Sequence, residues 1–596
     1  MNREKEEKWI AVIQSAVMRI ISACFLMSLF FLVVKEGDNL TLSYVDAISL
    51  PFFVGGMIVI IAILSAIAFK VKNTRKFDVL TVLAVSVLYA VGVLKNATGP
   101  YVSAGIALLF IIVLRFFVEK YEKQFLEFEI TKKQVLIVGA AVACIWVVLM
   151  LIIGILRYVC YASPNFDMGI FSQMFYYMKK TFAPITTCER YKELSHFAVH
   201  VSPALYVFLP IYFIFPSPVM LVVIQVLFLI SGVIPLYKIC KNHKLSNYIT
   251  LGILIATICY PALAGGCFYD FHENMMLFPC LLWLFYFMEK KKTVWFWVFV
   301  AFTLLIKEDA AFYVACIGLY MILGRKEYKK GGITFGVSLV WFFLAIVYLK
   351  IYGDGLMTGR YANYLSNQDD SFFMIFATIL KDPAYALGQI FTKEKMEYFL
   401  WILVPILALP AVTKKPSEYI LLIPTLLVNL LTSYQYQFSI FFQYSFGTMA
   451  MLFYIVTLEI GRCEYKKAKK VVTYMTIASL FMGCNLYRTA KMYVKDYYMA
   501  KHDTFEVVDS ALKDIPEDAS VEATTFLIPK LSQRKVVYQY QDAWKTEDKK
   551  CDYLVIDLIY DSSKKIYEEN RNQWIAAGYQ ETWHQDNAVV VFEKQS

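Results

Sequence analysis

Stretches such as QVLIVGAAVACIWVVLMLIIGILR, residues 134–157, decide the fold of this chain. A helix of roughly 20 such residues crosses the roughly 30 Å hydrocarbon core of a bilayer. Comparable apolar runs recur from Trp9 to about Ala490. Each run must be helical, because a helix satisfies its own backbone hydrogen bonds where no water is present. The pattern predicts a polytopic α-helical membrane protein.

The composition agrees with this prediction. Of the 596 residues, 59% are hydrophobic and 18% are charged, whereas soluble proteins carry about 45–50% and about 25%. The net charge of +10 does not indicate a nucleic-acid partner, because Lys and Arg stand in short clusters between apolar runs. The 12 cysteines form no Cys-x-x-Cys pair, so neither a disulfide framework nor a zinc site is indicated. The first run, residues 9–34, is too long for a signal-peptide core and is expected to stay as an anchor.

About fifteen candidate spans follow from the apolar runs. They cover approximately residues 9–34, 45–69, 77–94, 101–118, 134–157, 218–237, 248–264, 275–288, 294–306, 310–323, 333–349, 398–411, 419–432, 443–460 and 471–486. Some middle spans are short, which fits broken or tilted helices. Basic residues cluster in alternate loops, which is typical of the cytoplasmic side. An odd number of spans then places the N-terminus in the cytoplasm and the C-terminus outside it.

Two outward segments, residues 158–215 and 353–397, are too long to be turns. The first contains an Asn165–Gly169 stretch, followed by apolar residues at spacings of three and four: Ile170, Met174, Phe175 and Met178. This spacing predicts a helix lying in the membrane interface, with Lys179 and Lys180 near the headgroups.

Hydropathy falls and alternation appears after Tyr493. We expect a small extracytoplasmic α/β domain over residues 493–596, after an added segment (1–133) and a transmembrane core (134–492). The predicted helices are residues 505–515 and 562–577, and the predicted strands are residues 520–524, 535–540, 552–558 and 588–592. Residues 553–558 within the third of these strands form the one continuous apolar run, so we expect this run to be buried on both faces of a mixed sheet that packs over the outer face.

Ionisable residues gather at the outward ends of the predicted spans, where they mark candidate function. They are Asp167, His196, His200, Asp270, His272, Glu273, Lys307, Glu308 and Asp309. Three of these features also have a structural explanation that needs no functional site. Asp167 would be a helix N-cap, the His272–Glu273 loop would be a capped turn, and the Lys307–Asp309 triplet would be a boundary turn. His196 and His200 would share a helix face, but they lack the Glu of the zinc-protease motif, so metal ligation is the weaker interpretation.

Several ordered motifs carry a family resemblance. They are Phe166–Gln173, His200–Pro203 with Leu209–Tyr212, Asp270–Glu273, Lys307–Asp309, Gln443–Ser445, and Ile515–Val521 with Ile528–Arg534. In these motifs the chain resembles the predicted membrane proteins of domain-of-unknown-function family two thousand and seventy-nine, although Lys530 stands where His is expected. The likeness covers about Gln134 to the end, and the first four spans look like an addition. The family is grouped with the GT-C glycosyltransferases.

The resemblance implies an enzyme of the cell envelope, in a bacterial plasma membrane, that moves a sugar from a polyprenyl-phosphate lipid to an acceptor on the outer face. An acidic residue in the first long outer loop is the usual base, and Asp167 matches it. The superfamily often has a second acid beside the base, where this chain has Met168, so Glu308 and Asp309 are alternative bases. The residues expected to bind substrate are Gln173, His200, His272, Glu273, Lys307, Arg360 and Tyr444.

The chemistry of such a transfer agrees with these residues. One carboxylate must take the proton of the acceptor hydroxyl. Positive charge must face the departing phosphate, and Lys307, Arg360 or a divalent cation held by carboxylates would supply it.

Two rival functions stay open. A lipid or solute transporter or flippase would place charges near the midplane of interrupted helices in repeated halves, and the sequence shows outer-face clustering and no repeat. In a structural or sensory protein, the carboxylates of the outer loops would have no functional role. We predict that Asp167, His200, His272, Glu308 and Asp309 converge on one outward cleft, because isolated charges facing lipid would be costly.

Overall fold

A computed structural model describes residues 3–35, 37, 41–94, 99–353, 358–366, 373–484, 486–540 and 551–595. The chain forms two compact units, Met1–Phe117 with Leu480–Arg488, and Val118–Ser479 with Thr489–Ser596. Within the described residues, 9 helices are long and apolar enough to cross a membrane, and four further apolar helices are shorter. The polytopic helical fold is therefore confirmed, whereas the number of spans stays a prediction.

The first unit is a small helical bundle. Its helices are α1 (Arg3–Val34), α2 (Leu42–Asp46), α3 (Leu50–Lys70), α4 (Thr74–Leu94) and most of α5 (Pro100–Lys120). Helix α1 packs against α3 and α4. Arg19 joins all three helices, because it pairs with Asp78 at 2.9 Å and donates to Ser65 at 3.1 Å. Large apolar side chains such as Ile58 stay exposed, as lipid-facing residues must.

The second unit holds the main helical bundle. Its helices before the C-terminal domain are α6 (Glu122–Glu127), α7 (Lys132–Val159), α8 (Ile170–Thr181), α9 (Leu209–Ile214), α10 (Pro218–Ser231), α11 (Val233–Asn242), α12 (Asn247–Ile258), α13 (Pro261–Phe268), α14 (Leu277–Glu289), α15 (Thr293–Leu304), α16 (Ala310–Leu323), α17 (Tyr328–Tyr352), α18 (Phe373–Lys381), α19 (Pro383–Ile390), α20 (Lys393–Leu403), α21 (Ile423–Thr425), α22 (Phe446–Arg462), part of α23 (Tyr465–Cys484) and part of α24 (Tyr487–Lys491).

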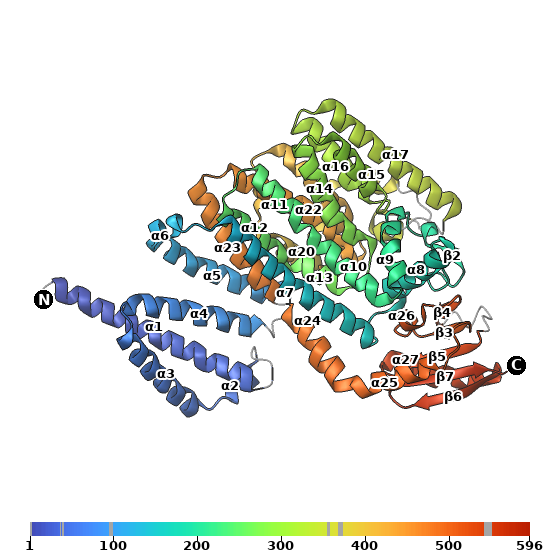
Figure 1. The fold of residues 1–596 in the computed structure, drawn as a ribbon, viewed down its shortest axis with the longest axis horizontal. Coiled ribbons are helices and arrows are strands. Elements are labelled where there is room, and N and C mark those ends of the chain that lie inside the picture. The colour runs from blue at the N-terminus through green and yellow to red at the C-terminus, as the bar shows by residue number, and fades with distance from the viewer. Residues whose placement is uncertain are drawn as a thin grey trace. The chain divides into compact units, whose positions relative to one another are not determined.

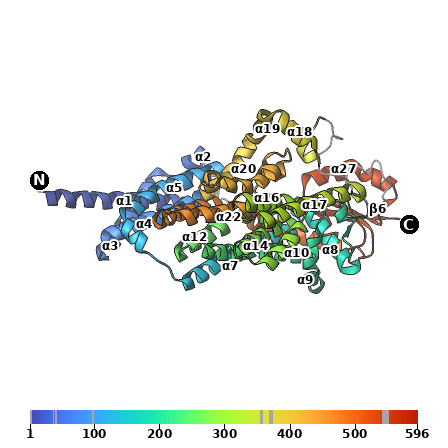
Figure 2. The same cartoon turned by 90° about the horizontal axis from the view of Figure 1, so that it is seen from above.

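The centre of this bundle is α22, which is buried from Phe446 to Ile460. It packs on α14 through the stacked rings of Tyr454 and Phe285, whose centroids are 3.8 Å apart. Helix α7 runs beside α10 and α12 (Figure 1), and α16 and α17 lie side by side (Figure 2). Thr131 is the N-cap of α7 and forms a reciprocal capping box with Gln134.

The C-terminal domain is a five-stranded mixed sheet with helices on both faces. Its strands, in sheet order, are β4 (Val537–Gln539), β3 (Val521–Ala523), β5 (Tyr553–Asp557), β7 (Val589–Lys594) and β6 (Tyr579–Gln585), and its helices are α25 (Ala500–Lys513), α26 (Ile528–Leu531) and α27 (Asp561–Ala576). The strands β4, β3 and β5 run parallel, and β7 and β6 continue the sheet antiparallel (Figure 1).

The central strand β5 is buried on both faces, as predicted. Leu554 and Ile556 pack with Trp574 of α27, whereas Val555 packs with Val508 of α25 on the other face. The sequence did not indicate β6, because its side chains after Tyr579 are mostly exposed and show no apolar alternation.

Residues 170–178 are helical, as predicted, but protein covers the apolar face that was expected to lie against the membrane. Helix α8 packs against β1 (Ile185–Thr186), α9 and α26. Met174 and Phe175 of its apolar face are fully buried in the protein. Protein, and not lipid, covers this face. The second strand of the outer segment, β2 (Leu194–Ser195), pairs antiparallel with β1.

Candidate functional site

Asp167 sits in a strained turn between α7 and α8. Its φ and ψ angles are 73° and −69°, close to the γ-turn that is rare for residues with a side chain. Such a conformation costs roughly 1–3 kcal/mol and persists only where the surroundings impose it. Asn165, two residues earlier, is tied on both sides, because its amide group donates to the carbonyl of Cys188 at 2.8 Å and its backbone N–H donates to Thr525 at 3.1 Å.

The C-terminal domain holds the first turn of α8 behind this loop. Ser532 donates to Ser172 at 2.7 Å, and the amide of Gln533 donates to the same hydroxyl at 2.9 Å. A Cβ added to Gly169 would lie 2.5 Å from Asn165 Oδ1 and 2.8 Å from Ile528 Cγ2. Only glycine therefore fits where α26 meets the turn of Asp167.

Gln173 belongs to this scaffold. Its amide nitrogen donates to Thr187 at 2.9 Å and to the carbonyl of Arg534 at 3.3 Å, and its oxygen accepts from the backbone N–H of Thr187 at 2.8 Å. The structure places this predicted substrate contact among backbone and hydroxyl partners instead of beside the charged residues.

The loop between α13 and α14 brings buried charges to the same region. Asp270 accepts from Ser163 at 2.7 Å and pairs with Arg157 at 3.3 Å. Gln225 of α10 binds both ends of the loop, since it donates to the carbonyl of Tyr269 at 3.0 Å and accepts from the N–H of His272 at 3.1 Å. Arg157 and Gln225 are functional candidates that do not follow from the sequence motifs. Arg157 lies at the end of an apolar run and Gln225 lies inside one, and such isolated polar residues are a signal of function that could have identified both.

Glu273 and Lys307 form a fully buried ion pair. Glu273 Oε1 lies 3.0 Å from Lys307 Nζ, and the side chains are 0% and 1% exposed. His272 lies 3.1 Å from the other carboxylate oxygen. Burial alone would raise the pKa of Glu273, but the neighbouring His272 and Lys307 outweigh burial and lower the pKa to about 2. Burial and the charge of Lys307 depress the pKa of His272, so His272 is uncharged at neutral pH. Lys307 is therefore the cation that keeps Glu273 ionised at neutral pH.

Glu308 and His200 form a second pair. The His200 Nδ1 atom is 2.8 Å from Glu308 Oε1, and the N–H of Val201 donates to Oε2 at 3.1 Å. Burial first, and then the charge of Lys307, hold the pKa of His200 well below its usual value, so a neutral imidazole donates to the carboxylate. Both oxygens of Glu308 are therefore committed to the protein.

Asp309 follows in the same turn and differs from Glu308. Its Oδ1 atom is buried and has no hydrogen-bond partner among the described residues. Burial raises the pKa of its carboxyl to about 6, against the lowering effect of Lys307. The charge of Arg360 also lowers the pKa of Asp309. The Arg360 guanidinium lies over the rings of Tyr434 and Tyr444, 5.1 Å and 5.5 Å from their centroids.

Asp167 faces this charged cluster. Its Oδ2 atom accepts from Gln443 at 3.4 Å, and its side chain is partly exposed. Desolvation of the carboxylate, followed by the negative charges of Glu273 and Asp270, raises the pKa of Asp167 to about 8. The effects of Lys307 and His196 in the opposite direction are smaller. The ionised form of Asp167, which predominates above a pH of about 8, is a stronger base than an ordinary carboxylate and can take a proton from a hydroxyl.

The structure decides between the structural alternatives for these residues. The N-cap of α8 is Gly169, so the interpretation of Asp167 as a cap is wrong. His272 does cap the turn Glu273–Met276 by accepting from the N–H of Asn274. The Lys307–Asp309 triplet is indeed a turn between α15 and α16, but its charges point into the protein. His272 and the Lys307–Asp309 triplet therefore combine these structural roles with a place in the charged cluster.

His196 and His200 do not share an α-helical face. A short 3-10 turn, His196–Ala198, separates them, and their ring centroids are 6.1 Å apart. His196 pairs with Glu189 at 3.0 Å, while His200 pairs with Glu308. Among the described residues, the His, Cys, Asp and Glu side chains that lie close enough to share one ion are His502, Asp503 and Glu506 of α25. The positive charge in the cluster comes from Lys307 and Arg360.

The comparisons with known proteins agree with this architecture. The model of a family described as predicted membrane proteins, DUF2079, matches residues 157–590. The chain belongs to this family. No curated protein matches it. Among solved structures, ArnT from Cupriavidus metallidurans bound to undecaprenyl phosphate is similar, with a TM-score of 0.50 and 11% identity over 78% of this chain and 98% of ArnT. The apo state of the same ArnT matches with a TM-score of 0.37, 10% identity and coverage of 76% and 98%.

These matches show the family and the fold. Membership in DUF2079 makes the chain an integral membrane protein. The likeness to ArnT gives the expected GT-C-like helical architecture.

Proposed function

We propose that the protein is an inverting membrane glycosyltransferase that takes a sugar from a polyprenyl-phosphate donor. The observation that carries this proposal is the position of Asp167 at the edge of a cluster that contains Lys307 and Arg360. The backbone of Asp167 is strained, and the pKa of its carboxyl group is raised to about 8. A similar fold binds undecaprenyl phosphate in ArnT, which supports a lipid-phosphate donor.

The reaction assigns one task to each group. The Asp167 carboxylate takes the proton of the acceptor hydroxyl as its oxygen forms a bond to the anomeric carbon on the face opposite the lipid phosphate. The bond between this carbon and the phosphate oxygen breaks, and its electron pair leaves with the phosphate. Arg360 can bind the departing phosphate through two N–H groups. Lys307 adds positive potential from its pair with Glu273.

Asp309 is the second candidate base, and Glu308 is less suitable. Asp309 keeps an oxygen without a hydrogen-bond partner among the described residues, whereas Glu308 uses both oxygens for His200 and Val201. We also propose the orientation that follows from the basic loops. The N-terminus lies in the cytoplasm of a bacterial cell, and the site and the C-terminal domain lie outside the plasma membrane.

A donor-consumption assay tests the proposal. The protein in nanodiscs is mixed with a panel of undecaprenyl-phosphate hexoses, and release of the lipid phosphate is measured. Asp167→Asn keeps the volume of the side chain and removes the base, so turnover should fall by roughly 10²- to 10⁴-fold. Asp561→Asn is the matched control, because Asp561 is fully exposed at the start of α27. Full turnover by Asp167→Asn would show that Asp167 is not the base.

A further inference from the structure

One short segment of the C-terminal domain contacts the Asp167 turn on both sides. Before the turn, the hydroxyl of Thr525 accepts from the backbone N–H of Asn165 at 3.1 Å. After the turn, a Cβ atom on Gly169 would lie 2.8 Å from Ile528 Cγ2, so α26 is in direct contact with the chain there. Asp167 therefore lies between two residues that the same segment contacts.

The contacts of this segment continue into the first turn of α8. The hydroxyl oxygens of Ser532 and Ser172 are 2.7 Å apart. Gln533 donates to the hydroxyl of Ser172 at 2.9 Å and to its carbonyl at 3.2 Å, and it accepts from Tyr212 of α9 at 3.0 Å. We call residues 525–533 the clamp segment, because its two ends bind the chain before and after the turn.

The clamp segment is itself fixed to the sheet. Thr524, immediately before it, donates its N–H to the carbonyl of Val555 at 3.1 Å, and its hydroxyl donates to the carboxylate of Asp557. The N–H of Asp557 donates back to the same hydroxyl at 3.0 Å. Leu527 of the clamp segment is fully buried in a core that it shares with Ile170 of α8. The C-terminal domain cannot leave the turn without exposing this apolar core to water.

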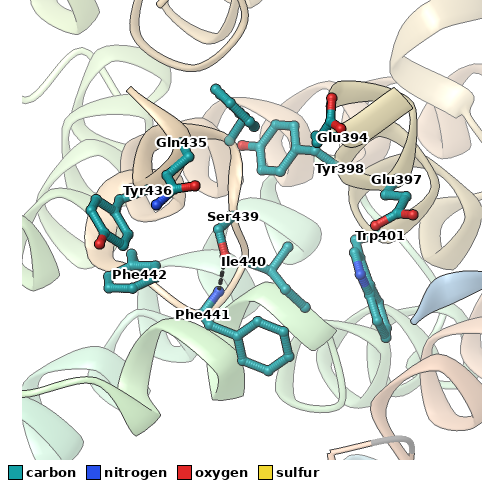
Figure 3. Close-up of a pocket in the computed structure, with 11 residues that line it drawn as sticks. Glu394, Glu397, Tyr398, Trp401, Gln435, Tyr436, Ser439, Ile440, Phe441 and Phe442 are labelled. Carbon is teal, nitrogen blue, oxygen red and sulfur yellow. Dashed lines mark hydrogen bonds between the residues drawn. The ribbon is translucent and has the colours of Figure 1, made fainter. Parts of the chain in front are cut away.

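The opposite side of Asp167 is bound less firmly. Its carboxylate accepts from Gln443 at 3.4 Å, which is longer than a typical hydrogen bond. Gln443 follows Phe442, which lines a cavity of about 290 Å³ between α20 and segment 435–442 (Figure 3). A strained conformation persists only where its surroundings impose it, and the clamp segment supplies firmer contacts than this side does.

We infer that Thr525 is a positioning residue for the proposed base and that the clamp segment imposes the strained conformation of Asp167. This inference rests on the proposed function for the role of Asp167 in transfer. The C-terminal domain is thereby part of the active centre, because a carboxylate that relaxed out of this turn would leave its place beside the charged cluster. A displacement of about 1 Å from a productive geometry can lower a rate by roughly 100-fold.

Hydrogen exchange tests the clamp segment without any assay of transfer. Thr525→Val keeps the shape of the side chain and removes the acceptor, so the N–H of Asn165 loses its partner and the turn should open more often. Peptides that cover residues 163–173, from the full-length protein in nanodiscs, should exchange roughly tenfold faster in this variant than in the wild type. Thr525→Ser keeps a hydroxyl and should restore slow exchange. Thr582→Val, on the edge strand β6, is the matched control.

Infrared titration gives a second reading that a loss of general stability would not change. The band that disappears in Asp167→Asn reports the protonated carboxyl of Asp167. Burial and the negative charges of Glu273 and Asp270 raise the pKa of this carboxyl to about 8. Release of the turn should move the carboxyl away from these surroundings. Its pKa should therefore fall toward the ordinary value in the variant that lacks the hydroxyl, and stay at about 8 in the variant that keeps it.

Three outcomes would overturn the inference: unchanged exchange in Thr525→Val, an unchanged pKa of Asp167 in that variant, or fast exchange in Thr525→Ser as well. Gln533→Met removes the hydrogen bonds on the other side of the turn and keeps the test decisive where Thr525→Val fails to fold. It should also accelerate exchange of residues 163–173, and exchange equal to that of the wild type would contradict the clamp.

The donor-consumption assay separates this inference from the proposed function. In an active preparation, Thr525→Val should lower kcat by roughly 10- to 100-fold with little change in the KM for the lipid donor, and Thr525→Ser should restore it. Full kcat in a variant with fast exchange would overturn the positioning role. A wild type that consumes no donor would refute the proposed function, and the exchange and infrared results would still decide whether the clamp segment imposes the conformation of Asp167.

Discussion

The buried pair of Glu273 and Lys307 allows a quantitative test of the cluster. In Lys307→Met the cation is removed and the Glu273 carboxylate stays fully buried. The pKa of Glu273 is about 2 in the folded protein, against an ordinary value of 4.5. At about 1.4 kcal/mol per pH unit, this gap corresponds to about 3 kcal/mol of stabilisation of the charged form by His272, Lys307 and the other neighbouring groups together. Loss of one partner of a buried pair costs about 3–5 kcal/mol in other proteins.

The pH dependence of this variant has a definite sign. In the wild type, the depressed pKa of Glu273 contributes stability above pH 4.5 that is lost as the pH falls toward 2. In Lys307→Met, burial without a cation raises the pKa of Glu273 above 4.5. The destabilisation should then be greatest at alkaline pH and should lessen as Glu273 takes up a proton in acid.

Scanning fluorimetry in nanodiscs from pH 5 to pH 9, at a fixed scan rate, measures these effects. Lys307→Met should unfold at a lower temperature than the wild type, most clearly at pH 9, and Lys307→Met with Glu273→Gln should recover much of the loss. Lys329→Met is the matched control, because Lys329 is exposed on α17. An unfolding temperature of Lys307→Met equal to that of the wild type at every pH would refute the inferred coupling.

Three further outcomes are expected. Donor turnover should rise with pH through about 8 as Asp167 ionises, and a pH profile without this rise, measured with the lipid-phosphate release assay, would exclude Asp167 as the titrating base. Gly169→Ala should cost about 1–3 kcal/mol and reduce turnover, because the new methyl group meets Asn165 and Ile528; an unfolding temperature and a turnover equal to those of the wild type would contradict the tight contact. A reporter fused after Glu593 should be active only outside the cytoplasm, and cytoplasmic activity would reverse the proposed orientation.

The candidate site could be predicted in part. The motifs around Asp167, His200, His272 and Lys307 were visible because charged residues interrupt apolar sequence, which is costly unless the charges are paired or functional. The individual pairings were not visible, although the convergence of His200 and Glu308 on one cleft was predicted. Asp270 pairs with Arg157, 113 positions away, and His200 pairs with Glu308, 108 positions away. Pairing across such separations depends on which helix ends meet, and one sequence contains no signal for that.

The sequence by itself determined that this protein spans a membrane and ends in an α/β domain. Length and hydropathy are local properties, and each apolar run or alternating strand carries them independently of the rest of the chain. Only the tertiary structure decided what covers each element. The apolar face of α8 has the spacing of an interfacial helix, but α26 and α9 cover it, and Gln173 binds the C-terminal domain. Periodicity reveals which face of a helix avoids water, and the packing partner decides whether that face meets lipid or protein.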